Sequence, residues 1–320
     1  MVLRLLKLEG EFIDEHICER YIELESRTET LKQDLGIVNS GVTTIDVDFE
    51  PSVTAKRKSK KRDPNEGLSD RYYLEISQAI TSLHSSKDND NSTTGFVLWS
   101  TTPFFIRWLL YDPEARPFRA GGYVGDVAIP PILSSSTAVV ELGGGTSGIL
   151  PIVLGNYVAA YICTDQKGLI NGMKSNITRN LLQLNKRRCV SKSLQIDSSP
   201  NPADTKPTVN LETIPLDWEN PHLDNLPEIQ LASNCSTIYI VAMDVIYNDY
   251  LIDPFLETLS GLLQHFQSRN INIHCLIGVH MRAQEVVTDF LNKAMLQYNL
   301  PVHYIDCDAI RASRFSIYFI

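Results

Sequence analysis

The sequence predicts an α/β fold built around a mostly parallel sheet, and three observations support this. From residue 137 onward, apolar strand-like segments alternate with helix-like segments, which is typical of β–α units with helices on both faces of a sheet. The first of these strands runs into a glycine-rich turn at 143–148. No helix is expected between the last two strands, so the last strand is expected to run antiparallel.

The N-terminal part predicts a smaller set of elements. Apolar residues at helical spacing among charges predict a helix over 11–35. Alternating apolar and polar residues predict a strand or hairpin arm over 39–50. Residues 51–70 are charged and hold two prolines, which favours a mobile surface loop, and 85–92 is a second polar stretch. An apolar, aromatic block then starts at residue 95 and continues to Tyr111 as a helix.

The alternating strands and helices are expected from residue 137 to residue 319. Strands are expected over 137–142, 157–164, 208–214, 237–243, 272–279, 301–306 and 313–319. Helices are expected near 147–155, 167–185, 251–268 and 282–297. The polar segment 189–207, with three prolines and a serine-rich stretch at 195–200, is expected to be an inserted loop. We therefore divide the chain into an N-terminal α/β extension, residues 1–94, and a main domain, residues 95–320.

Bulk composition narrows the class of protein. The chain has 320 residues, of which 43% are hydrophobic and 21% charged, as in ordinary soluble globular proteins. No segment approaches the roughly 20 apolar residues that cross a bilayer, and charges follow the N-terminus too closely for a secretory signal. Six scattered cysteines without a C-x-x-C pair predict reduced, buried thiols in an intracellular protein. The sequons at Asn91, Asn176 and Asn234 then carry no meaning.

The charge is unevenly distributed. Residues 56–62 carry six positive charges, and removing them from the net charge of −9 leaves −15 on the rest of the chain. A body this acidic suits basic protein partners better than nucleic acid. The basic run itself has two interpretations, a solvated loop or a segment for nuclear import or contact with ribosomal RNA.

The glycine turn is the most informative segment. An apolar strand containing Glu141 leads into three adjacent glycines, which bring bare backbone close to a ligand at the opening of a parallel sheet. Gly143, Gly145 and Gly148 also match the dinucleotide pattern G-x-G-x-x-G. Glu141 favours instead a ligand with a positive amino acid group, such as S-adenosylmethionine. A tight strand-to-helix turn without any ligand is the alternative.

Two further strand ends carry candidates for ligand contact. Asp165 ends the second strand, where a carboxylate can reach ribose hydroxyls. The alternative for Asp165 is an N-cap of the next helix. Trp218 follows the third strand and can stack on adenine or simply pack a loop. The sequence alone favours a core position for Trp99, in the earlier aromatic block. It does not decide between a core and a functional role for Arg107.

Asp244 and Tyr247 form a D-x-x-Y motif where the fourth strand leaves the sheet. A carboxylate three residues before a phenol at this exit can face a transferred methyl group. The alternative is a helix cap at Asp244 and a core aromatic at Tyr247. We expect Asp244 to orient an acceptor amine and Tyr247 to form one wall of its channel.

Together, residues 141–146, 164–165, 216–218 and 244–247 resemble the seven-strand protein-lysine methyltransferases with a D-x-x-Y motif. The resemblance covers about residues 95–320, and the N-terminal part is similar to the ribosomal lysine methyltransferases of yeasts. It implies a Rossmann-like seven-strand sheet with an antiparallel last strand and S-adenosylmethionine as methyl donor.

The resemblance also implies the site and the substrate. The implied donor contacts are Trp99, Glu141, Gly143, Gly144, Gly145, Asp165, Trp218 and Met243. The implied acceptor is a lysine of a large-subunit ribosomal protein, with elongation factors and chaperones as alternatives within the same branch. No metal site is expected.

Two hypotheses from other classes compete with this one. The first is a nicotinamide-dependent oxidoreductase, disfavoured by Glu141, by the lack of an evident second substrate domain and by the helix-free end of the chain. The second is a cofactor-binding adaptor without activity, disfavoured by the intact pair Asp244 and Tyr247. We further expect a monomer that binds neither nucleic acid nor membranes and works in the cytoplasm, with the nucleus as a second location.

Overall fold

The computed structural model describes residues 3–27, 35–51, 67–80, 94–196, 205–221, 223 and 232–320. The basic run 56–62, most of the loop 51–70 and the stretch 85–92 lie outside the described residues. The strands are β1 (Arg4–Lys7), β2 (Thr44–Phe49), β3 (Tyr72–Ser77), β4 (Gly122–Val124), β5 (Val127–Ile129), β6 (Thr137–Leu142), β7 (Ala160–Asp165), β8 (Arg188–Val190), β9 (Thr208–Pro215), β10 (Thr237–Met243), β11 (Asn272–His280), β12 (His303–Asp306) and β13 (Phe315–Phe319). The α-helices are α1 (Ile13–Glu25), α3 (Thr101–Tyr111), α4 (Arg116–Ala120), α5 (Ile149–Leu154), α6 (Lys167–Arg179), α8 (Ile252–Gln267), α9 (Gln284–Asn292) and α10 (Asp308–Arg311).

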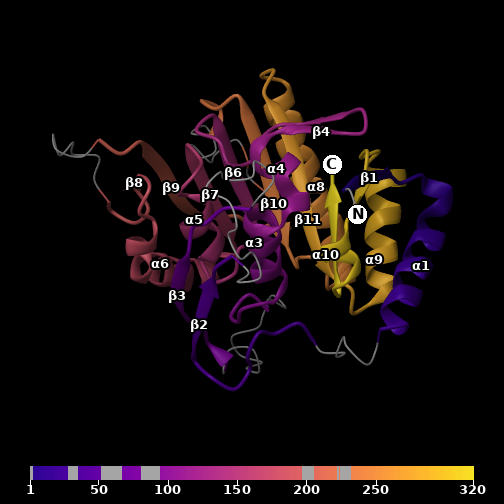
Figure 1. Ribbon diagram of the computed structural model, residues 1–320, viewed down its shortest axis with the longest axis horizontal. Coiled ribbons are helices and arrows are strands. Elements are labelled where there is room, and N and C mark those ends of the chain that lie inside the picture. Colours follow the sequence, from indigo (N-terminus) through magenta and orange to yellow (C-terminus); the bar gives the residue numbers. More distant parts are fainter. Residues whose placement is uncertain are drawn as a thin grey trace, which may run out of the picture.

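One large sheet forms the centre of the molecule, in the order β1-β12-β13-β11-β10-β6-β7-β9-β8 (Figure 1). The strands from β11 to β8 are parallel, whereas β13 is antiparallel to both β11 and β12. The seven strands predicted from residue 137 onward are all present in this sheet, which contains two more and so has nine in total. The additional strands, β1 and β8, lie at its two edges and are too short to produce a periodic sequence signal.

The centre of the sheet is fully covered by helices. Strands β6, β7 and β10 are buried along their whole length, which explains their continuous apolar sequences. Helix α3 packs against β10 and β11, and α8 packs against β11. At the end of the sheet that carries β1, α1 lies beside α9, on the right of Figure 1. None of the helices in the described part of the chain is both long and apolar enough to span a membrane.

Several element boundaries differ from the predicted ones. The helix expected over 11–35 ends at Glu25, while 28–34 lie outside the described residues. A one-turn helix, α10, separates β12 from β13, so the expected direct connection was wrong. The segment 189–207 is not wholly a loop, because it begins within β8. Helix α9 continues into a π-helical turn, Lys293–Gln297, and the two together match the helix predicted over 282–297.

The antiparallel hairpin β2–β3 docks on α6 through two asparagine side chains one helical turn apart. Asn180 accepts a hydrogen bond from the Glu75 backbone N–H at 3.0 Å and donates to the Glu75 carbonyl at 2.9 Å. Asn176 makes the same pair of bonds to Ser77, at 2.9 and 2.8 Å. Asn176 also donates to the Thr146 carbonyl at 2.7 Å, so it joins the hairpin to the turn that follows β6.

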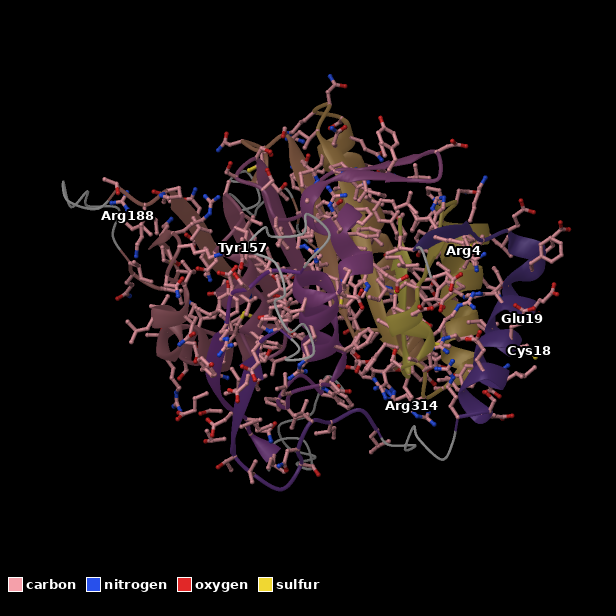
Figure 2. The ribbon with its side chains drawn as sticks, viewed as in Figure 1. Arg4, Cys18, Glu19, Tyr157, Arg188 and Arg314 are labelled. Carbon is pink, nitrogen blue, oxygen red and sulfur yellow. The ribbon has the colours of Figure 1, made fainter. Side chains whose placement is uncertain are left out.

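The six cysteines are all free thiols. Four are buried and Cys189 is half-buried, but Cys18 is exposed on the outer face of α1 (Figure 2). The prediction of buried thiols was therefore wrong for Cys18, because α1 has only one neighbour-facing side and Cys18 lies on the other.

Candidate active site

A cavity opens where β6, β7, β9 and β10 end, at the edge of the sheet expected to bind a ligand. Its empty volume is about 740 Å³ when the open mouth is included. The described residues that line it are Thr94, Gly95, Val97, Leu98, Trp99, Thr102, Gly143, Gly144, Gly145, Ser147, Asp165, Gln166, Leu216, Asp217, Trp218, Glu219, Met243, Asp244, Val245, Tyr247 and Leu251. Every predicted site residue except Glu141 is in this set.

The glycine turn needs its glycines for packing within the protein. Gly143 and Gly145 have φ angles of +70° and +62°, which L side chains rarely adopt. A Cβ atom on Gly143 would lie 2.6 Å from Val245 Cγ1, and one on Gly145 would lie 3.0 Å from the Gly95 carbonyl oxygen. Because the same glycines line the cavity, the turn is both tightly packed and open to a ligand on its other side.

Glu141 lies beneath the turn and does not line the cavity. Its carboxylate accepts a hydrogen bond from the Tyr161 hydroxyl at 3.0 Å, and a Cβ on Gly144 would touch it. Burial raises the pKa of Glu141 to about 7, although the Tyr161 hydrogen bond opposes this change. In this position the acid supports the turn from behind.

Asp165 lines the cavity at the end of β7 and is not the N-cap of α6, which is Gln166. One carboxylate oxygen accepts from the Gly145 backbone N–H and the other from the Gln166 N–H, both at 2.7 Å. Burial raises the pKa of Asp165 to about 6, against the opposing effect of these two bonds. The bonds fix the carboxylate and leave each oxygen a further lone pair for a ligand hydroxyl.

The apolar walls come from residues that the sequence left partly ambiguous. Trp99 and Trp218 are half-buried and line the cavity, so neither is a pure core residue. Trp218 packs edge-on against Phe255 at 5.2 Å between ring centroids. Its buried Nε1 has no hydrogen-bond partner among the described residues, which leaves one donor beside the cavity. Met243 ends β10 with its sulfur packed against Gly278.

Asp244 and Tyr247 both reach the cavity from the exit of β10. Asp244 has a φ of +62°, and its backbone N–H donates to the Gly278 carbonyl at 2.7 Å, which turns the chain sharply out of the sheet. The residue that caps the next helical turn is Asn248 and not Asp244. Burial raises the pKa of Tyr247, so its phenol is neutral at physiological pH.

Arg282 completes the site and was missed in the sequence. It lies two residues beyond β11, and its guanidinium binds both oxygens of the Asp244 carboxylate, at 2.8 and 3.1 Å. It also stacks on the Trp99 ring, 4.7 Å from the centroid. The only available signal was its place after the strand predicted over 272–279, the fifth predicted from residue 137 onward, whose carboxyl end meets the same sheet edge. Arg107, by contrast, contacts β2 and does not line the cavity.

The charge of the lining distinguishes between ligands. The described lining includes four carboxylates and no lysine, arginine or histidine; the carboxylates are Asp165, Asp217, Glu219 and Asp244. Arg282, which lies next to the lining, pairs with only one of them, Asp244. Such a cavity disfavours the pyrophosphate of a dinucleotide and suits a ligand that carries ammonium and sulfonium charges. The residues present therefore fit S-adenosylmethionine.

Comparisons with known proteins agree with this geometry. The profile of a family described as Lysine methyltransferase matches residues 78–297. The chain belongs to this family. Proteins named Ribosomal lysine N-methyltransferase 5 from Zygosaccharomyces rouxii and Saccharomyces cerevisiae (strain AWRI796) are 48% and 43% identical to it, with 100% of both chains covered in each comparison.

As a lysine methyltransferase, the protein is an enzyme that uses S-adenosylmethionine as methyl donor. The hypotheses of an oxidoreductase and of an inactive adaptor are both wrong. A solved structure titled Human methyltransferase 10 domain containing protein aligns with a TM-score of 0.31 and 12% identity, over 57% of this chain and 69% of that chain. That likeness is too weak to bear on the fold.

Proposed function

We propose that this lysine methyltransferase modifies a lysine of a ribosomal protein, and a large-subunit protein is the first candidate. The observation that carries the proposal is the full-length similarity to relatives whose names state a ribosomal lysine methyltransferase activity. The net charge of −9 supports it, because an acidic enzyme attracts strongly basic acceptors. Elongation factors and chaperones are the alternative acceptors.

We assign seven of the nine strands to the methyltransferase sheet, in the order β12-β13-β11-β10-β6-β7-β9. On this assignment β1 and β8 are additions at the edges, and residues 1–94 form an extension to the domain 95–320. The extension supplies β1 to the sheet and the hairpin β2–β3 to α6.

The donor is held, on this proposal, by the described lining of the cavity. Gly143, Gly144 and Gly145 offer backbone to its amino acid part, and the fixed Asp165 carboxylate accepts from its ribose. Trp99, Trp218 and Met243 supply apolar walls. Glu141 acts from behind the turn, where it supports Gly144 without direct contact with the donor.

The chemistry asked of the protein is small. S-adenosylmethionine, when bound, supplies a methyl group already activated by its sulfonium. The acceptor lysine must be neutral to attack, which costs about 4–5 kcal/mol at pH 7 for an amine with a pKa near 10.4. We assign Asp244 to orient this amine and the neutral phenol of Tyr247 to wall its channel, while the proton leaves to water.

The proposal is tested by incubating the purified protein with labelled donor and, in parallel, with ribosomes or with the ribosome-free extract of cells lacking its gene. A labelled ribosomal protein band is expected, and its loss by about 100-fold with Asp244→Asn. Asn is chosen because it tolerates the positive φ at position 244. Label on a non-ribosomal protein alone would move the assignment to an elongation factor or chaperone, and unimpaired methylation by D244N would remove Asp244 from the mechanism.

We also propose a monomeric enzyme of the cytoplasm, with the nucleus as second compartment, that makes no direct contact with nucleic acid. Light scattering of the purified protein, imaging of a tagged chain and methylation of ribosomes before and after nuclease treatment test these three statements. A dimer, an exclusively nuclear signal or nuclease-sensitive activity would each overturn one of them.

A further inference from the structure

The ion pair between Asp244 and Arg282 is a two-point contact beside the cavity. The two side chains meet in a fork geometry, with both carboxylate oxygens bound. The Asp244 side chain is 1% exposed and that of Arg282 is 15% exposed, so water screens this pair weakly. An incoming amine therefore meets a carboxylate whose charge is already compensated.

The guanidinium is itself held from three sides. Besides Asp244, it lies over the Trp99 ring, and one of its nitrogens donates to the Leu35 carbonyl at 3.0 Å. The segment that carries Leu35 runs across Trp99: the Gly36 carbonyl accepts from the Ser100 N–H at 2.7 Å. The cation is thus fixed by elements that lie far apart in the sequence, which a purely local salt bridge would not require.

We propose that Arg282 is a positioning residue for methyl transfer: it holds the Asp244 carboxylate in one orientation and cancels its charge. The inference rests on the proposed role of Asp244 toward the acceptor. A lone carboxylate would stabilise the lysine as an ammonium ion, which cannot attack. A carboxylate paired with Arg282 can still accept an N–H from the neutral amine but attracts a second cation far less.

Within the part of the chain that the structure describes, few other groups can produce the same effect. The titratable or charged neighbours of this pair are Tyr21 on α1 with Arg20 and Arg314 near it, His280 at the end of β11, Tyr247, and Asp165 beyond Tyr247. Burial raises the pKa of Tyr21 to about 12, so that phenol is neutral. Arg282 is the cation in direct contact with the Asp244 carboxylate.

The test is the pH profile of methylation at saturating donor for wild type, Arg282→Gln and Arg282→Lys. In R282Q the unpaired carboxylate should hold the acceptor as an ammonium ion, so the rising limb of the profile moves up by about one pH unit or more. The rate at pH 7 then falls about 10- to 100-fold and recovers toward high pH. R282K restores the cation without the fork, so its limb should stay at the wild-type pH while kcat is lower.

Arg107→Gln is the matched control. Arg107 also donates to a backbone carbonyl, that of Asp48 at 3.1 Å, and stacks on an aromatic ring, that of Phe49 at 5.2 Å, but it touches no cavity carboxylate. Its variant should keep the wild-type profile. The inference fails, and Arg282 is only structural, if R282Q and R282K reduce the rate equally at every pH. It fails likewise if R282Q unfolds while R282K keeps the wild-type kcat at all pH values. Absence of incorporation by the wild-type protein would instead overturn the proposed function.

Discussion

At the scale of single residues, the glycine turn shows how strictly the site depends on missing side chains. Gly143 combines a positive φ with a Cβ position 2.6 Å from Val245 Cγ1. Gly168, in α6, has open space around the same position. The geometry of the site therefore requires glycine at position 143, whereas position 168 has room for a side chain.

We expect Gly143→Ala to lower the free energy of unfolding by about 2–5 kcal/mol, through left-handed backbone strain and overpacking. Donor affinity should fall with it, because the turn must move. Gly168→Ala, in the first turn of α6, should instead stabilise the protein by about 0.4–1 kcal/mol, because alanine has fewer backbone conformations to lose on folding. Urea unfolding and donor titration of both variants measure the effects, and equal stability of the two would show that the turn tolerates a side chain.

Glu141 makes the stability of the donor-free protein depend on pH. Its pKa is raised from 4.5 to about 7, so the folded protein binds this proton more tightly than the unfolded chain does. The stabilising contribution is complete below about pH 4.5 and is lost as the pH rises through about 7. Between about pH 5 and pH 8, the wild type should therefore lose about 2 kcal/mol more stability than Glu141→Gln.

Denaturant unfolding of both proteins across this pH range measures the difference. Glu219→Gln, which also removes one carboxylate but at an exposed residue of the cavity mouth, is the control. Parallel curves for wild type and E141Q would show that Glu141 is charged in the folded state at all these pH values.

At the scale of elements, docking of the hairpin β2–β3 on α6 depends on two side-chain amides that pair with the backbone of β3 as a neighbouring strand would. Asn176 and Asn180 each donate to and accept from the backbone of β3. Only Asn176 also binds the Thr146 carbonyl beside the glycine turn. Asn171, on the same helix, is exposed and serves as a control.

We expect Asn176→Ala and Asn180→Ala each to lower the free energy of unfolding by about 1–3 kcal/mol, because buried backbone groups lose their partners. Asn171→Ala should change it by less than about 0.5 kcal/mol. Donor affinity should fall in N176A and stay at the wild-type value in N180A. Identical donor affinity in all three variants would show that the hairpin and the turn are independent.

Elements with a strong local pattern were predictable, and those defined by distant partners were not. The longer strands and helices from residue 137 onward, which leaves out β8 and α10, follow from apolar runs and helical spacing. Short edge strands such as β1 and β8 owe their conformation to pairing with β12 and β9. The same holds for the site: the residues at strand ends were found, whereas Arg282 gains its role only through contacts with Asp244 and Trp99.

At the scale of the whole molecule, the net charge of −9 should govern how the acceptor is captured. Salt screens the long-range attraction between an acidic enzyme and a basic protein, but it screens the buried ion pair of Asp244 and Arg282 much less. We expect KM for the acceptor to rise several-fold between about 0.05 and 0.3 M salt while kcat changes little. Steady-state kinetics with the intact acceptor and with a short peptide around its lysine give the comparison. An equal, weak response for both would exclude long-range steering.

The amide of Asn176 has a consequence for motion. One nitrogen satisfies two carbonyls, Thr146 at 2.7 Å and Ser77 at 2.8 Å, on segments separated widely along the chain. A ligand that reduces motion of the turn at Thr146 should also reduce motion of β3 at Ser77, because the Asn176 amide binds both carbonyls. Deuterium uptake at the Ser77 amide should therefore slow when donor binds, although that amide lies outside the pocket, and the slowing should vanish in N176A.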